Sequence, residues 1–237
     1  MLEGYLAYDD DVQGKRPGVM VVHEWTGLGP YVQQRAKQLA ELGYVALAID
    51  MYGKGIRPKN DKEAAAQATI YRSDRKLMRV SEACRRLRAA AGLKVLQQND
   101  LTDKDRIAAI GYCFGGGTVL ELARSGADVK GVVSFHGNLD TPNPSDARNI
   151  KGKVLVLHGA EDPLVPPKQV LGFAEEMSGA DVDWQMVAYG NAVHSFTNPG
   201  AGNDKSKGVA YNQAADQRSF ADMKQFFTEI FQSRKPK

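Results

Sequence analysis

Residues 106–123 read RIAAIGYCFGGGTVLELA, and this stretch decides the fold. A short apolar run ends at a glycine-rich turn that carries Cys113, and a helical pattern follows at once. Gly111 and Gly115 flank the cysteine with the G-x-S-x-G spacing of a nucleophile elbow, with sulfur in place of oxygen. The following helix would point its N-terminal dipole at the sulfur, which favours the reactive thiolate. The pattern predicts that Cys113 is a nucleophile rather than a small buried side chain.

Apolar runs like the one before Cys113 recur along the chain, each closed by glycine or a polar turn. They cover residues 18–24, 44–50, 106–112, 130–137, 153–159 and 182–190. Runs of Val, Ile and Leu without strict alternation are typical of parallel strands that are buried on both faces. Helical patterns fall between the runs, at 31–43, 74–92 and 210–232. Their alternation predicts an α/β fold with a mostly parallel sheet and helices on both faces.

The length of 237 residues predicts one domain spanning 1–237, large enough to bury a core without staples. The formal net charge of +3 is too small and too evenly spread to indicate nucleic-acid binding. No apolar run reaches the length that a membrane span needs, and the acidic N-terminus does not read as a signal peptide. We expect a cytoplasmic protein that is a monomer or a weak homodimer.

The chain has two cysteines, and the one other than Cys113 is Cys84, which lies on the apolar stripe of the 74–92 helical pattern. That position predicts a core side chain, so a disulfide framework is not expected. The four histidines and two cysteines show no metal-ligand spacing, so no metal and no cofactor are expected.

Two residues downstream of Cys113 complete a candidate triad. Asp162 lies in the loop after the apolar run 153–159, and His194 lies past the end of 182–190. The order nucleophile, acid, histidine is that of α/β hydrolases. An imidazole can take the thiol proton and return it to a leaving group, while a carboxylate fixes its tautomer. His158, by contrast, reads as a structural residue at a strand end.

The loop VVHEWTGLGPYV follows the first long apolar run and is the place where such folds supply one oxyanion-hole N–H. We expect the backbone N–H groups of Trp25 and Phe114 to form the hole. Glu24 stands beside it, where a carboxylate makes chemical sense if it accepts the thiol proton or controls thiolate formation. His23 and His136 end strands and are expected to line the pocket wall.

These segments together resemble the dienelactone hydrolase family, small cysteine-dependent enzymes with the α/β-hydrolase fold. The resemblance covers nearly the whole chain and rests on VVHEWTGL, GYCFGG, LHGAEDPLVP and HSFTNP, which stand in the family's order. It implies a triad of Cys113, Asp162 and His194, and it implies that Glu24 holds the resting thiol. The family clamps a substrate carboxylate with arginines, one of them four residues after the catalytic histidine, but this chain has Asn198 there.

The other family clamp falls in the 60–75 region, where Arg72 and Arg75 cannot be assigned from the sequence. A pocket without the clamp should prefer neutral esters or lactones, because a buried charge without a partner is costly. Neutral phosphotriesters are expected as a side activity. We expect Asn198, Tyr112 and His136 to contact the substrate. The irregular loop 51–67 follows a strand end, and two interpretations stay open: a cover over the site or an ordinary surface loop.

Two other functions remain open at this point. A redox-sensing or ligand-binding module would use Cys113 as a reactive thiol without turnover. An acyltransferase would pass the acyl group to an alcohol or thiol instead of water, with the same triad.

Overall fold

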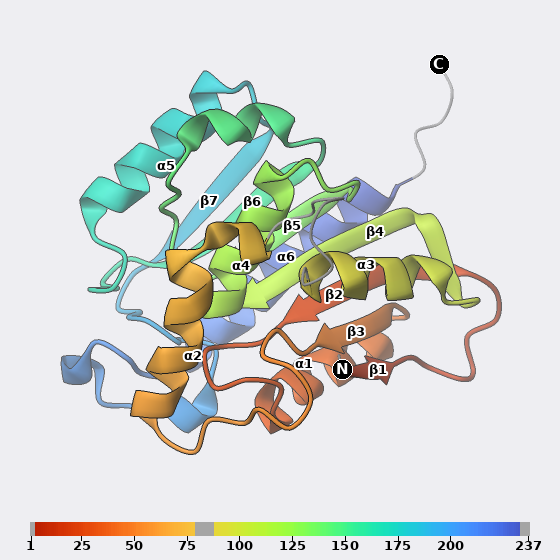
Figure 1. Cartoon of the computed structure of the whole chain (residues 1–237), viewed down its shortest axis with the longest axis horizontal. Coiled ribbons are helices and arrows are strands. Elements are labelled where there is room, and N and C mark those ends of the chain that lie inside the picture. The colour runs from red at the N-terminus through yellow and green to blue at the C-terminus, as the bar shows by residue number, and fades with distance from the viewer. Residues whose placement is uncertain (1–2, 79–87, 233–237) are drawn as a thin grey trace.

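A computed structural model describes residues 3–78 and 88–232 of the chain (Figure 1). Its centre is a seven-stranded sheet in the order β1-β3-β2-β4-β5-β6-β7. Every neighbouring pair is parallel except β1 and β3, which are antiparallel. The predicted mostly parallel sheet is therefore confirmed.

The strands follow the apolar runs closely. Their bounds are β1 Gly4–Ala7, β2 Arg16–Val22, β3 Val45–Ile49, β4 Thr102–Tyr112, β5 Gly131–Phe135, β6 Lys153–Gly159 and β7 Trp184–Tyr189. The first strand was not predicted. It has four residues at the sheet edge, and only Ala7 is buried, so it carries almost no hydrophobic signal.

Helices cover both faces of the sheet, as predicted (Figure 1). Their bounds are α1 Pro30–Glu41, α2 Asp61–Ser73, α3 Arg88–Gln98, α4 Phe114–Arg124, α5 Pro167–Gly179 and α6 Gln213–Phe231. One core cluster joins a sheet face to α3, α4 and α5, and the other joins the opposite face to α1 and α6. Of these helices, α1 and α6 match their predicted positions, whereas α5 carried no prediction.

Two helical segments differ from the sequence prediction. The second part of the predicted loop 51–67 belongs to α2, whose N-cap Asn60 accepts a hydrogen bond from the Glu63 N–H. Within the predicted helix 74–92, residues Arg75–Met78 form a 3-10 turn. The α-helix α3 begins at residue 88 and ends at residue 98, beyond the predicted end. Residues 79–87, with Cys84 among them, lie outside the described part of the chain.

The candidate site residues lie together at the carboxyl ends of the parallel strands. Cys113 follows β4, Asp162 lies in the loop after β6, and His194 lies in the loop after β7. These strands run in the same direction, so their carboxyl ends meet on one side of the sheet, where open α/β sheets bind ligands. Within the described residues, no helix is long and apolar enough to cross a membrane.

Candidate active site

The turn that carries Cys113 has the geometry of a nucleophile elbow. The Cys113 backbone has a φ of 53° and a ψ of −114°, and the residue is the N-cap of α4. A Cβ added to Gly111 would lie 2.0 Å from the Gly115 carbonyl oxygen, and one added to Gly115 would lie 2.2 Å from the Val22 oxygen. Both glycines are therefore required by close backbone contacts.

The three predicted triad residues lie within hydrogen-bonding distance of one another. His194 Nε2 is 3.0 Å from Cys113 Sγ, and His194 Nδ1 is 2.8 Å from Asp162 Oδ2. All three residues are buried, with 5% to 6% of their surface exposed. The Asp162 carboxylate also accepts a hydrogen bond from the Leu164 N–H, which holds it in place in its loop.

The surroundings of His194 favour its protonated form. Burial alone would lower its pKa, but the charge of Cys113 and the hydrogen bond to Asp162 act against burial and raise the pKa to about 10. An imidazolium at this position faces Sγ throughout the neutral pH range. Such a partner favours the thiolate, the nucleophilic form of cysteine.

The two expected oxyanion donors both have a backbone N–H without a hydrogen-bond acceptor among the described residues. Phe114 opens α4, where the first N–H groups of a helix have no intrahelical partner. Trp25 lies in the turn after β2. Gly115, the residue after Phe114, packs against the end of that strand. The packing of Gly115 on Val22 brings the elbow next to the Trp25 turn.

Glu24 lies in the site, but its carboxylate has other partners than the thiol. Asn198 Nδ2 donates to Glu24 Oε2 at 2.6 Å, and Ser195 Oγ donates to Oε1 at 3.4 Å. Burial raises the pKa of Glu24, and the Asn198 hydrogen bond opposes that shift. The thiol itself contacts His194, so this structure does not contain the Glu24–thiol contact that the family resemblance implies.

Three residues expected to contact substrate have structural partners instead. Asn198 holds Glu24 with its amide nitrogen and accepts from the Gly200 N–H with its oxygen. Tyr112 is 1% exposed and stacks on Phe135 in the core, because its side chain points to the face of the sheet away from the elbow. None of these side chains lines the cavity at Cys113.

His136 is the third of those residues, and its ring contacts the backbone of the elbow rather than the cavity. The Cys113 N–H is shared between the Phe135 carbonyl oxygen at 3.0 Å and His136 Nδ1 at 3.1 Å, so Nε2 carries the ring proton and donates to Thr197 Oγ1 at 2.7 Å. Burial and the nearby His194 lower the pKa of His136 well below its ordinary value. A neutral imidazole with an accepting Nδ1 therefore fixes the backbone of the nucleophile.

A cavity of about 290 Å³ opens at Cys113 and His194. Its other walls are Arg72, Arg75, Asn138, Asp140, Leu164, Val165 and Gln169. The two arginines that the sequence could not assign thus both reach the cavity. Arg75 forms an ion pair with Asp140 at 2.9 Å, whereas the Arg72 side chain has no ion pair within the described residues. No residue of the loop 51–67 lines this cavity, whose wall from this region comes from the end of α2 and the turn after it.

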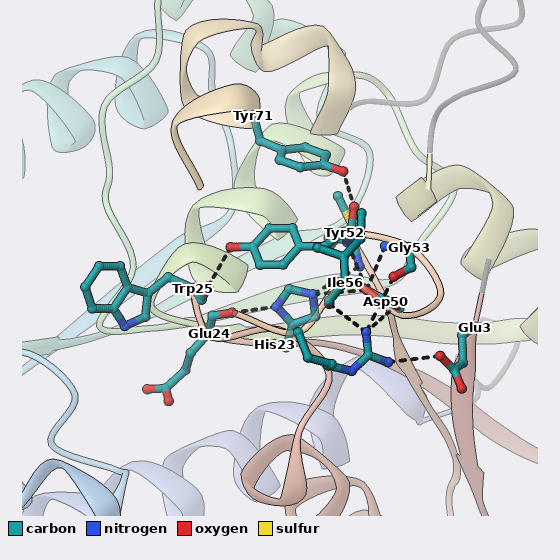
Figure 2. A network of polar contacts seen from close by, with 11 residues as sticks. Glu3, His23, Glu24, Trp25, Asp50, Tyr52, Gly53, Ile56 and Tyr71 are labelled. Carbon is teal, nitrogen blue, oxygen red and sulfur yellow. Dashed lines mark hydrogen bonds and ion pairs between the residues drawn. The ribbon is translucent and has the colours of Figure 1, made fainter. Parts of the chain in front are cut away.

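Two side chains around the Trp25 turn were not predicted correctly from the sequence. His23 was expected in the pocket wall, and Tyr52 was not singled out at all. His23 is fully buried and contacts backbone groups rather than the pocket, and the Tyr52 hydroxyl donates to the Trp25 carbonyl (Figure 2). The only sequence signal for either is the position of each just after a predicted strand end. Across residues 3–78 and 88–232, no group of His, Cys, Asp or Glu side chains is arranged to hold a metal ion.

Comparison with known proteins identifies consistent relatives. The model described as "Dienelactone hydrolase family" matches residues 2–231. A solved structure named m3DLH is 42% identical, with a TM-score of 0.90 over 98% of this chain and 93% of that one. A dienelactone hydrolase-like promiscuous phosphotriesterase from metagenomic libraries is 40% identical, with the same TM-score and coverage. A Bradyrhizobium protein described as "Probable 2-oxo-3-(5-oxofuran-2-ylidene)propanoate lactonase" is 26% identical, with 78% of this chain and 75% of that one aligned.

Proposed function

Because the chain belongs to the dienelactone hydrolase family, we propose that it hydrolyses neutral carboxylic esters or lactones with Cys113 as nucleophile. The observation that carries this proposal is the continuous hydrogen-bond chain from Cys113 Sγ through His194 to Asp162. The lactonase description of the Bradyrhizobium relative supports the reaction class.

The first half of the reaction acylates the enzyme. The Cys113 thiolate attacks the carbonyl carbon, a C–S bond forms, and the carbonyl electron pair moves to oxygen. The N–H groups of Trp25 and Phe114 stabilise that oxyanion. As the tetrahedral intermediate collapses, the C–O bond to the leaving group breaks, and the His194 imidazolium gives the departing oxygen its proton.

The second half returns the enzyme to its starting state. Neutral His194 takes a proton from water, and the hydroxide attacks the thioester carbonyl in the same oxyanion hole. The C–S bond then breaks, which releases the carboxylic acid and regenerates the thiolate beside the imidazolium. Asp162 accepts the hydrogen bond from His194 Nδ1 in both halves and so holds the ring in the required orientation.

The cavity walls support a substrate that is neutral at its reacting end. The Arg75 charge is balanced by Asp140, so it adds little net field at the thiol. Arg72 also lines the cavity, but its side chain is exposed, so solvent screens its charge. Asn198 replaces the second arginine of the family clamp and is already bonded to Glu24.

The decisive experiment compares wild type with Cys113→Ala in hydrolysis of p-nitrophenyl acetate and p-nitrophenyl butyrate. Loss of turnover in a folded variant supports the proposal, and undiminished turnover contradicts it. If neither protein turns over, the thiol-sensor function is favoured instead. Adding an alcohol acceptor to the wild type separates hydrolysis from acyl transfer, because only a transferase partitions to the new ester.

A second candidate activity is the hydrolysis of neutral phosphotriesters. The observation in its favour is the 40% identity to a promiscuous phosphotriesterase over nearly the whole chain. The thiolate would attack phosphorus, form a P–S bond and expel the aryloxide, with the developing negative oxygen in the same hole. His194 would then take a proton from water, and the hydroxide would attack phosphorus, break the P–S bond and release the phosphodiester. Turnover of paraoxon that disappears in Cys113→Ala is the expected result, and turnover that survives would assign it to another site.

A further inference from the structure

Two buried side chains hold the turn that carries Trp25 (Figure 2). Neither of them lines the cavity at Cys113. One is His23, at the end of β2. The other is Tyr52, which follows β3. Neither residue has a role in the reaction proposed above, yet both bond the backbone beside the expected oxyanion donor.

His23 is locked in one tautomer by its neighbours. The Met51 N–H donates to His23 Nε2 at 3.0 Å, so Nε2 carries no proton. The proton therefore sits on Nδ1, which donates to the Glu24 carbonyl oxygen at 2.5 Å. Burial lowers the pKa of His23 to about 4, which keeps the ring neutral at physiological pH.

This bond, together with a turn hydrogen bond from the Gly27 N–H to the same carbonyl oxygen at 3.2 Å, sets the direction of the Trp25 N–H. The Glu24 carbonyl and the Trp25 N–H belong to the same peptide group, and no peptide bond in the described chain is cis. In a planar trans peptide the two groups point in opposite directions. When His23 holds the carbonyl on its own side, the N–H must point away from His23. Figure 2 shows that the Glu24 carbonyl faces the His23 ring, while the Glu24 carboxylate points away from it.

Tyr52 fixes the next peptide group in the same turn. Its hydroxyl donates to the Trp25 carbonyl oxygen at 2.8 Å. With both carbonyls held, the φ and ψ angles of Trp25 have little freedom, and its N–H cannot swing. Tyr52 also lies close enough to the nucleophile for the charge of Cys113, after burial, to raise the pKa of its hydroxyl. His23 and Tyr52, which together we call the Trp25 clamp, are thus adjacent to the reacting centre.

The clamp is itself well supported. The His23 ring stacks with Phe114, whose N–H is the other expected donor, at a centroid distance of 5.9 Å. Behind it, the Asp50 carboxylate accepts from the N–H groups of Tyr52 and Gly53 at 2.9 and 3.0 Å. Arg57 bonds the second Asp50 oxygen at 2.9 Å. The turn after β3 therefore holds Tyr52 rigidly against the Trp25 turn.

We propose that His23 and Tyr52 are positioning residues that hold the two peptide groups around Trp25 and so aim its N–H at the oxyanion. This inference rests on the proposed thiol-dependent hydrolysis. A preorganised donor stabilises the transition state because it does not have to reorient during the reaction. Loss of one oxyanion donor costs about 10² to 10³ in rate, so loss of its aim with the donor retained should cost about 10-fold.

The test compares Tyr52→Phe with the matched control Tyr71→Phe in hydrolysis of p-nitrophenyl acetate. Both changes remove a buried phenol hydroxyl that donates to a backbone carbonyl, but Tyr71 bonds Met51 rather than Trp25. We expect kcat to fall about 10-fold in Tyr52→Phe, with KM unchanged, and to stay within about twofold in Tyr71→Phe. Equal losses in the two variants would overturn the proposal.

A second pair of variants tests His23 directly. His23→Asn places an amide N–H where Nδ1 donates to Glu24, whereas His23→Gln places an acceptor nearer to the Met51 N–H. The clamp predicts that the asparagine variant keeps several-fold more kcat than the glutamine variant. A merely structural histidine predicts that kcat follows thermal stability instead, and that result would overturn the proposal.

Two further readouts separate positioning from damage to the nucleophile. Alkylation of Cys113 by iodoacetamide forms no oxyanion, so its rate should stay within about twofold in Tyr52→Phe. Inhibition by butyraldehyde, whose carbonyl carbon bonds to Sγ and whose oxygen enters the hole, should weaken by the same factor as kcat. Alkylation that falls in parallel with kcat would overturn the clamp. Failure of the hydrolase proposal is seen separately, as turnover that persists in Cys113→Ala.

Discussion

Replacement of Asp162 by asparagine removes the charge that stabilises the His194 imidazolium. Burial, Cys113 and Asp162 together set the pKa of His194 at about 10, against an ordinary value of 6.5. The difference corresponds to roughly 5 kcal/mol in favour of the protonated ring. Cys113 and Asp162 share that contribution, so the loss of the Asp162 charge should lower the pKa by roughly 1 to 2 units.

The sign of the effect on activity follows from the role of the imidazolium. Acylation requires His194 in its protonated form, so the rate falls as the pH rises through the pKa of His194. Asp162→Asn should therefore move the basic limb of the kcat/KM profile to lower pH by about 1 to 2 units. In a serine triad the same change costs about 10⁴ in kcat because the wrong tautomer is favoured. We expect about 10² here, because sulfur is a better nucleophile than a serine hydroxyl and depends less on the base that the aspartate orients.

The assay is the pH profile of p-nitrophenyl acetate hydrolysis between pH 6 and 10.5, corrected for the spontaneous reaction. Glu161→Gln is the control, since it removes a carboxylate from the neighbouring position of the same loop. Glu161 is exposed and bonds Lys205, so its loss should change kcat/KM by less than about twofold. A basic limb that stays at the wild-type pH in Asp162→Asn would refute the coupling between Asp162 and His194.

Three further predictions concern the elbow, the resting thiol and the cavity rim. Gly111→Ala should lower the free energy of unfolding in urea by more than about 3 kcal/mol, because the new Cβ would overlap backbone atoms of Gly115. Gly179→Ala is the control: no atom lies within 4 Å of its new Cβ, so the free energy of unfolding should stay the same or rise slightly. Glu24→Gln should leave iodoacetamide alkylation at pH 7 within about twofold, since the thiol contacts His194, and a tenfold change would instead make Glu24 the resting partner. Arg72→Ala should leave kcat/KM for neutral p-nitrophenyl acetate within about twofold; a drop of more than tenfold would show that the exposed guanidinium binds even uncharged substrates.

The strands and the triad could be predicted because their signals are local. Every strand except β1 overlaps one of the predicted apolar runs, and Cys113, Asp162 and His194 each come after such a run. A parallel sheet then brings the three strand ends together without any knowledge of side-chain packing. The need for glycine at position 111 is equally local, since its contact with Gly115 spans only four residues, whereas Gly115 itself is required by the distant Val22 carbonyl.

One missed element had a signal in the sequence. Asn60 and Glu63 have the spacing of a capping box, and in the structure Asn60 Oδ1 accepts from the Glu63 N–H at the start of α2. The alanine-rich segment that follows has high helix propensity. The edge strand β1 is different. It depends on pairing with β3, some forty residues further along the chain, and no local pattern predicts that contact.

The residues that tune the site depend on contacts between distant segments. The role of His23 is fixed by the Met51 N–H, and that of Glu24 by Asn198, which is 174 positions away. Neither partner can be inferred from the neighbouring sequence. His136 was expected in the pocket wall because it ends a strand, but its positive φ of 39° turns the ring toward the Cys113 N–H.

Substrate choice is the least predictable property, and the cavity walls give the physical reason. The triad stands on strand ends, whose positions the sheet dictates, whereas the walls come from loops and helix ends that follow different strands. A wall residue cannot be judged by its type alone. Arg75 would suggest an anionic substrate, yet its ion pair with Asp140 largely cancels its charge. Arg72, three positions earlier, has the same side chain without that partner. The charge that a substrate meets is therefore set by pairing across segments 65 residues apart, and not by the count of arginines near the site.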